Sequence, residues 1–152
     1  MNRIVRRFVR VTLAMLIGTA ALLFPVVASA DSTSLQPQSG ELVAKGAEVA
    51  VNVTFSCPAG DTVANPLGMG GGLYVSVQQA VSKTRQASGF GSSGGEVCTG
   101  SAQTAVVQVL ADVSGPPFRV GPAVAFAFLQ ACDASFNCVF ASSAPTTIRI
   151  SN

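Results

Sequence analysis

The sequence predicts an all-β domain of about seven strands that two disulfides hold together. Three observations support this fold class. Apolar residues recur at every second position in several stretches, which is the periodicity of a strand with one buried face. Val, Thr, Ser and Gly are abundant, whereas the helix formers Glu, Lys, Arg and Leu are scarce. Four cysteines follow a candidate export signal, and disulfides persist outside the cytoplasm.

Residues 1–30 have the three-part pattern of a secretory signal peptide. Four arginines precede an uncharged apolar stretch over residues 11–27, and Ala28-Ser29-Ala30 forms an A-x-A cleavage site before Asp31. A membrane-spanning helix needs about 20 apolar residues, and Pro25 interrupts this one. We therefore expect a helical signal peptide that is cleaved after Ala30, and a secreted, extracellular product.

Cleavage changes the charge of the chain. Four of the nine basic residues leave with the signal, so residues 31–152 carry five basic and seven acidic side chains. Without a basic patch, nucleic acid and anionic membranes are not expected partners. No later apolar run is long enough to span a membrane.

The mature chain is expected to begin with a flexible N-terminus over residues 31–40, where polar residues predominate. A short strand over 41–45 should follow. Residues 49–57 alternate strictly between Val, Phe or Cys and the smaller residues Ala, Asn, Thr and Ser, which predicts a strand with one buried face. Pro58 and Gly60 end this strand, because proline cannot donate to a ladder and glycine admits turn geometry.

Two glycine-rich runs, residues 61–72 and 83–96, are predicted as loops because glycine weakens element interiors. Between them, residues 73–82 alternate between apolar and polar side chains and predict a further strand. The first run is expected to be mobile.

The C-terminal half predicts four more strands. Residues 103–111 place Ala105, Val107 and Val109 on one face. After a proline-containing loop over 112–121, residues 123–129 alternate alanine with large apolar residues, as in a strand packed on both faces. Short strands over 138–141 and 146–151 close the chain.

About seven strands separated by turns are typical of an immunoglobulin-like antiparallel β-sandwich, here a single domain over residues 41–152. A closed barrel is the alternative architecture.

The four cysteines, Cys57, Cys98, Cys132 and Cys138, predict two disulfides among three possible connectivities. The favoured pairs are Cys57 with Cys98 and Cys132 with Cys138, the second closing a five-residue turn. Pairing Cys57 with Cys132 across two sheets is the alternative. A zinc site is not favoured, because C-x-x-C clusters and histidines are missing from the chain.

The sequence offers no catalytic, metal or cofactor site. Histidine, the usual general base and the commonest zinc ligand, is absent from the chain, and the acidic residues are scattered along it. Residues 89–94 match a G-x-G-x-x-G pattern, but no surrounding β-α-β unit accompanies it. We therefore expect a non-enzymatic protein.

Met69 and Phe90 are candidate loop contacts, since they are apolar residues within the two glycine-rich runs. Packing over the ends of the sheet is the alternative for both. Five further phenylalanines are assigned to core or turn packing: Phe118, Phe126, Phe128, Phe136 and Phe140.

Three segments, Val49–Gly60 (VAVNVTFSCPAG), Pro117–Cys132 (PFRVGPAVAFAFLQAC) and the CDASFNC run that ends at Cys138, resemble small secreted actinobacterial proteins. That resemblance covers most of the mature chain and implies an immunoglobulin-like sandwich of unassigned function. A fainter similarity, carried by the cysteine-bounded turn and the last strand, is to neocarzinostatin-type apoproteins, which carry an apolar chromophore. The chain departs from them in its first cysteine pair, which is far apart in sequence.

These observations predict a secreted domain that binds a partner through its glycine-rich loops, and the candidate partners are an extracellular protein and an apolar small molecule. Two alternatives remain open, a carrier of an apolar small molecule and a protease inhibitor.

Overall fold

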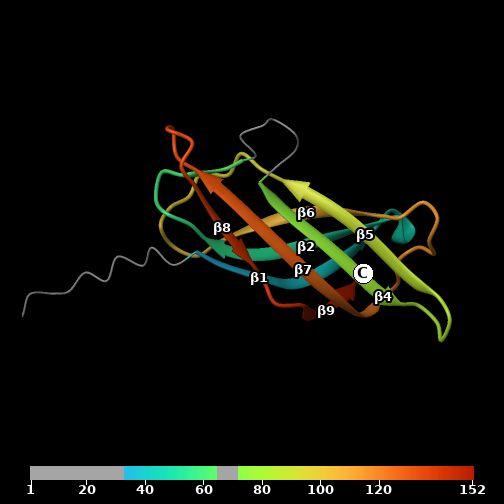
Figure 1. The fold of residues 1–152 in the computed structure, drawn as a ribbon. Coiled ribbons are helices and arrows are strands. Elements are labelled where there is room, and N and C mark those ends of the chain that lie inside the picture. Colours follow the sequence, from blue (N-terminus) through green and yellow to red (C-terminus); the bar gives the residue numbers. More distant parts are fainter. Residues whose placement is uncertain (1–32, 65–71) are drawn as a thin grey trace, which may run out of the picture.

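A computed structural model describes residues 33–64 and 72–152 (Figure 1). Within them lie nine strands and one 3-10 turn, η1 (Ala44–Gly46). The strands are β1 (Ser34–Val43), β2 (Glu48–Ser56), β3 (Thr62–Val63), β4 (Leu73–Ala80), β5 (Gln86–Ser93), β6 (Gln103–Ala111), β7 (Gly121–Cys132), β8 (Cys138–Ser142) and β9 (Thr146–Ser151). The all-β class is confirmed, and no described helix is long and apolar enough to cross a membrane.

Seven of these strands form one closed sheet in the order β7-β4-β5-β6-β2-β1-β9, and β9 pairs again with β7. Every pairing in this ring is antiparallel except that of β1 with β9, which is parallel. The fold is therefore a mixed seven-stranded barrel. The expected antiparallel immunoglobulin-like sandwich is wrong, because hydrogen bonds join what would have been the edges of its two sheets.

The barrel is closed by two short seams. Each seam consists of two residue pairs, which are Gly89–Ala111 and Phe90–Leu110 between β5 and β6, and Gly40–Ile150 and Glu41–Ser151 between β1 and β9. Figure 1 shows β5, β4 and β7 in front of the fainter β6, β2 and β1. The molecule thus keeps two layers, which explains why alternating strands predicted a sandwich.

Glycines occupy both seams. A Cβ at Gly40 would come within 2.8 Å of Val49 Cγ1 and 3.3 Å of Ile150 Cγ1, and a Cβ at Gly89 would overlap the carbonyl oxygen of Leu110. Glycine permits such close approach where a sheet turns a corner. The expectation of a loop over 83–96 is therefore wrong for Gln86–Ser93, which pairs with β4 along its whole length.

Two other segments that the sequence predicted as loop or flexible chain also contain strands. The expected flexible terminus is wrong from Ser34 onward, because β1 pairs with β2 over nine residue pairs. In the first glycine-rich run, Thr62 and Val63 form β3 against β7, and residues 65–71 lie outside the described residues. The signal peptide also lies outside them.

The interior of the barrel holds a single cluster of buried apolar side chains. Its largest fully buried members include Phe55, Phe118, Leu73 and Leu129. β7 contributes only small residues and Leu129 to this cluster, while its large side chains point outward. The prediction that β7 is packed on both faces is therefore wrong: Val124 is 45 % and Phe126 is 40 % exposed.

Both disulfides lie at the same end of the barrel. The structure pairs Cys57 with Cys98 and Cys132 with Cys138, the favoured connectivity. Thr62 links the two bridges, because it pairs with Cys132 in β7 and also bridges to Val97, the residue before Cys98. This end of the molecule is consequently cross-linked twice.

Candidate functional site

The outer face of the front layer carries a continuous line of aromatic side chains. We call Phe90, Tyr74, Phe128 and Phe140 the aromatic row; they come from β5, β4, β7 and β8 in that order. Successive ring centroids are 5.9, 6.2 and 6.0 Å apart. Phe90 and Phe140, at the two ends of the row, are each 57 % exposed.

Strand register explains why these rings meet. Tyr74 lies directly opposite Phe128, while Phe90 and Phe140 are each offset by two residues along their strands. Outward side chains of neighbouring strands lie within reach of one another both directly across and diagonally. The row therefore crosses four strands as a diagonal.

Further apolar side chains widen this surface. Leu110 of β6 lies opposite Phe90 and is 62 % exposed, and Phe126 of β7 lies one outward position from Phe128. A shallow hollow of about 340 Å³ lies between Phe90 and Leu110, and Asp112 forms part of its rim. Single exposed apolar residues are ordinary, but a contiguous apolar patch marks a binding surface.

The remaining outward positions of the same strands are uncharged. On β4, β5, β7 and β8 they are filled by serine, glutamine, alanine, valine, proline and the disulfide-bonded cysteines, and none of them is Asp, Glu, Lys or Arg. Four serines stand among the rings: Ser76, Ser88, Ser92 and Ser142. On these four strands the surface is thus apolar and hydroxyl-bearing, without fixed charge, and Asp112 lies at its edge on the rim of the hollow.

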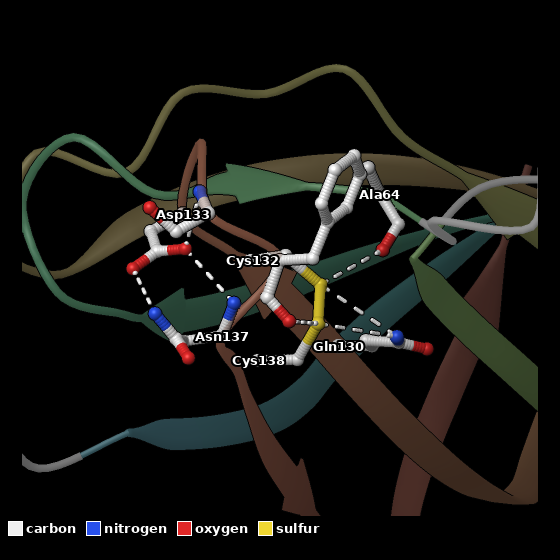
Figure 2. Close-up of a disulfide and its surroundings, with 8 residues drawn as sticks. Ala64, Gln130, Cys132, Asp133, Asn137 and Cys138 are labelled. Atoms are coloured by element: carbon white, nitrogen blue, oxygen red, sulfur yellow. Dashed lines mark hydrogen bonds between the residues drawn. A yellow bond between two sulfur atoms is a disulfide. The ribbon is translucent and has the colours of Figure 1, made fainter.

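A second exposed aromatic residue lies apart from this face. Phe136 is 74 % exposed in the turn between Cys132 and Cys138, with a positive φ of 63°. Figure 2 shows the turn, in which the Asp133 carboxylate accepts hydrogen bonds from the Asn137 side chain and backbone, both at 2.8 Å. These bonds and one from the Ser135 backbone hold the pKa of Asp133 below its ordinary value.

The disulfide of this turn is also contacted by a side chain of β7. The Gln130 amide nitrogen lies 3.6 Å from the Cys132 sulfur and 3.7 Å from the Cys138 sulfur (Figure 2). The turn is therefore fixed at its base by the bridge and inside by Asp133.

Comparison with known proteins gives no match: no family model, curated protein or solved structure is significantly similar to this chain.

The site residues predicted from sequence fall into three groups. Ala28, Ser29, Ala30, Asp31 and Met69 lie outside the described residues. The four cysteines form the cross-linked end. Phe90 is exposed, but it belongs to strand β5 and not to a loop.

The sequence placed Tyr74 on the polar face of its strand, but it assigned Phe126, Phe128 and Phe140 to core or turn packing. Of the five phenylalanines expected in core or turn packing, Phe118 is buried, Phe128 is half-buried, and Phe126, Phe136 and Phe140 are exposed. The alternation of β7 could have indicated that Phe126 and Phe128 point outward, because alanines occupy one face of this strand and the phenylalanines occupy the other. Within the described ranges, no three His, Cys, Asp or Glu side chains are grouped to hold a metal ion.

Proposed function

We propose that the mature protein is a secreted, non-enzymatic binding domain whose binding surface is the outer face of β8, β7, β4 and β5. The observation that carries this proposal is the aromatic row, in which two of four linked rings are more than half exposed. Exposed aromatic side chains on a rigid sheet supply large contact area at a low cost in conformational entropy. The lack of histidine in the chain further favours binding over catalysis.

This proposal moves the binding surface from the loops to a sheet face. The second glycine-rich run, expected as a binding loop, contributes Phe90 through strand β5 instead. An apolar ligand held inside the barrel is less well supported, because buried side chains of the core occupy the interior.

A protease inhibitor remains a second candidate because of the Phe136 turn. A cross-linked turn with an exposed phenylalanine offers a rigid anchor, but its backbone is curled: Asp133 N donates to Asn137 O, and Phe136 N donates to Asp133 O. This curled backbone weighs against an inhibitor, because protease clefts bind extended chain. Unhindered turnover by subtilisin-like proteases in the presence of the protein would remove this candidate.

The binding proposal is tested on protein purified from its own culture medium. Native mass spectrometry should detect a companion molecule with the wild type and lose it with the double variant Phe90→Ser/Phe140→Ser. Phe136→Ser is the matched control, because it removes an exposed ring that lies away from the row. If the wild type and the double variant retain the companion molecule equally, the proposal is contradicted.

A further inference from the structure

We propose that the partner of the aromatic row is an uncharged polysaccharide chain. This inference names the ligand class for the proposed binding face and therefore rests on the proposed function. Three features of the face favour such a partner: the arrangement of rings and hydroxyls, the absence of charge on its four strands, and its shape.

Rings and serines alternate across the strands. Ser76 lies between Phe90 and Phe126, in register with both. Tyr74 likewise has Ser92 as its partner on β5, and Phe128 has Ser142 as its partner on β8. Because serine is small, each of these pairings leaves ring surface uncovered beside a hydroxyl group.

This alternation matches the chemistry of a sugar ring. A pyranose presents C–H groups on its faces and hydroxyl groups around its rim. The C–H groups pack against the electron-rich face of an aromatic ring, while the hydroxyls exchange hydrogen bonds with serine and glutamine side chains. Within the described residues, no side-chain hydrogen bond involves Ser76, Ser88, Ser92 or Ser142, so their hydroxyls are available.

The absence of charge on this face disfavours other polymers. Nucleic acids and anionic membranes are bound through Lys and Arg, and neither occupies an outward position on β4, β5, β7 or β8. Protein interfaces share the enrichment in aromatic residues, but they are also enriched in Arg and depleted in Ser, whereas serines stand between the rings of this face and no Arg does. A neutral, hydroxyl-rich chain is the partner that this face complements.

The shape of the face favours a chain over a single sugar. The rings follow one another at about equal spacing across four strands, with centroid separations of 5.9, 6.2 and 6.0 Å. Such a row offers successive contacts to successive sugar units. A monosaccharide would gain only one of these contacts.

The experiment uses the full secreted protein and a panel of neutral polysaccharides: cellulose, chitin, mannan and α-glucan. Retention on the insoluble members is measured by sedimentation, and soluble oligosaccharides of each class are titrated by fluorescence. Tyr74 is the chain's single tyrosine and the chain has no tryptophan, so intrinsic emission reports directly on the row. Heparin serves as the charged counterpart.

We expect retention on at least one neutral polysaccharide, with a saturable change in Tyr74 emission and no retention on heparin. Phe90→Ser should weaken binding on the order of tenfold, because it removes one ring contact. The control Phe136→Ser should leave binding unchanged. Ser76→Val, which suits a strand but fills the space between Phe90 and Phe126, should also weaken it.

Three outcomes would overturn the inference. If the panel is not retained but a protein companion depends on the row, the partner is a protein, and the proposed binding function stands. If sedimentation equilibrium shows self-association that Phe90→Ser abolishes, a second copy covers the face. If neither a polysaccharide nor any row-dependent companion binds, both the inference and the proposed function are wrong.

Discussion

Asp133 organises the turn between β7 and β8 through three hydrogen bonds of 2.8 Å, from Ser135 N, Asn137 N and Asn137 Nδ2. The donors stabilise the charged carboxylate, so the pKa of Asp133 in the folded protein is lower than in the unfolded chain. The sequence identified this segment as a cysteine-bounded turn. It did not indicate which side chain would satisfy the backbone donors inside it.

The lowered pKa of Asp133 predicts a specific dependence of stability on acid. As the pH falls through the ordinary aspartate pKa of about 3.9, the unfolded chain takes up the proton first. The contribution of Asp133 is therefore complete above that pH and is lost as the pH falls through the folded-state pKa. Urea unfolding between pH 6 and pH 2 should show a shallower acid decline for Asp133→Asn than for the wild type.

Asp112 provides an independent comparison for that measurement. Hydrogen bonds from the Ser114 backbone and hydroxyl, at 3.0 and 2.8 Å, also lower the pKa of Asp112. Asp112→Asn should remove a separate part of the acid decline, so the double variant should be flatter than either single variant. Identical curves for Asp133→Asn and the wild type would show that the turn does not depend on the carboxylate.

At the scale of elements, β5 shows how composition can mislead. Its sequence, QASGFGSS, contains two glycines and three serines and lacks the alternating large residues of its neighbours. The glycines serve close approach to β6: a Cβ at Gly89 would lie 2.9 Å from the Phe118 ring, and Gly91 faces the Gln108 backbone. The same residues that predicted a loop are thus the ones that allow the seam to form.

Gly91→Ala should destabilise the protein by roughly 1–3 kcal/mol, because the added methyl group forces β5 away from β6. The neighbouring Ser92→Ala is the matched control: Ser92 points outward, and its replacement should change the free energy of unfolding by less than about 0.5 kcal/mol. Both values are measured by urea denaturation. Equal stability of the two variants would mean that the seam tolerates a wider spacing.

Elements with plain alternation were predicted well. The expected strand over 103–111 is β6, and the expected strand over 146–151 is β9. In β6, the alternation of Ala105, Val107 and Val109 with exposed residues directly reflects one buried face. Where one position broke the pattern, as at buried Gln79 in β4, a tertiary contact was responsible: its amide bonds Arg119 N and O at 2.8 and 2.7 Å.

For the molecule as a whole, the two disulfides constrain the unfolded chain to different extents. Cys57 and Cys98 are separated by 41 residues in sequence, and Cys132 and Cys138 by 6. Loop-closure entropy then assigns about 4 kcal/mol to the first bridge and about 2 kcal/mol to the second. Both bridges strengthen the same end of the barrel, opposite the end that holds the β4–β5 hairpin.

Replacing Cys57 and Cys98 together by alanine should therefore cost more stability than replacing Cys132 and Cys138 together. Urea unfolding under non-reducing conditions gives both free energies, with the wild type measured after reduction as the reference for the loss of both bridges. The opposite ranking would show that native contacts of the short turn, not loop length, dominate the contribution of the disulfides.

The sequence by itself determined the all-β class and most strand positions, which follow from local properties, namely period-two alternation and turn residues. It favoured the observed pairing of the cysteines but left three connectivities possible, and the structure decided between them. Only the tertiary structure decided that the strands close into a barrel and that aromatic residues of four strands form one exposed row. Closure and exposure depend on which strand edges meet and in which register, and residues far apart in sequence set both.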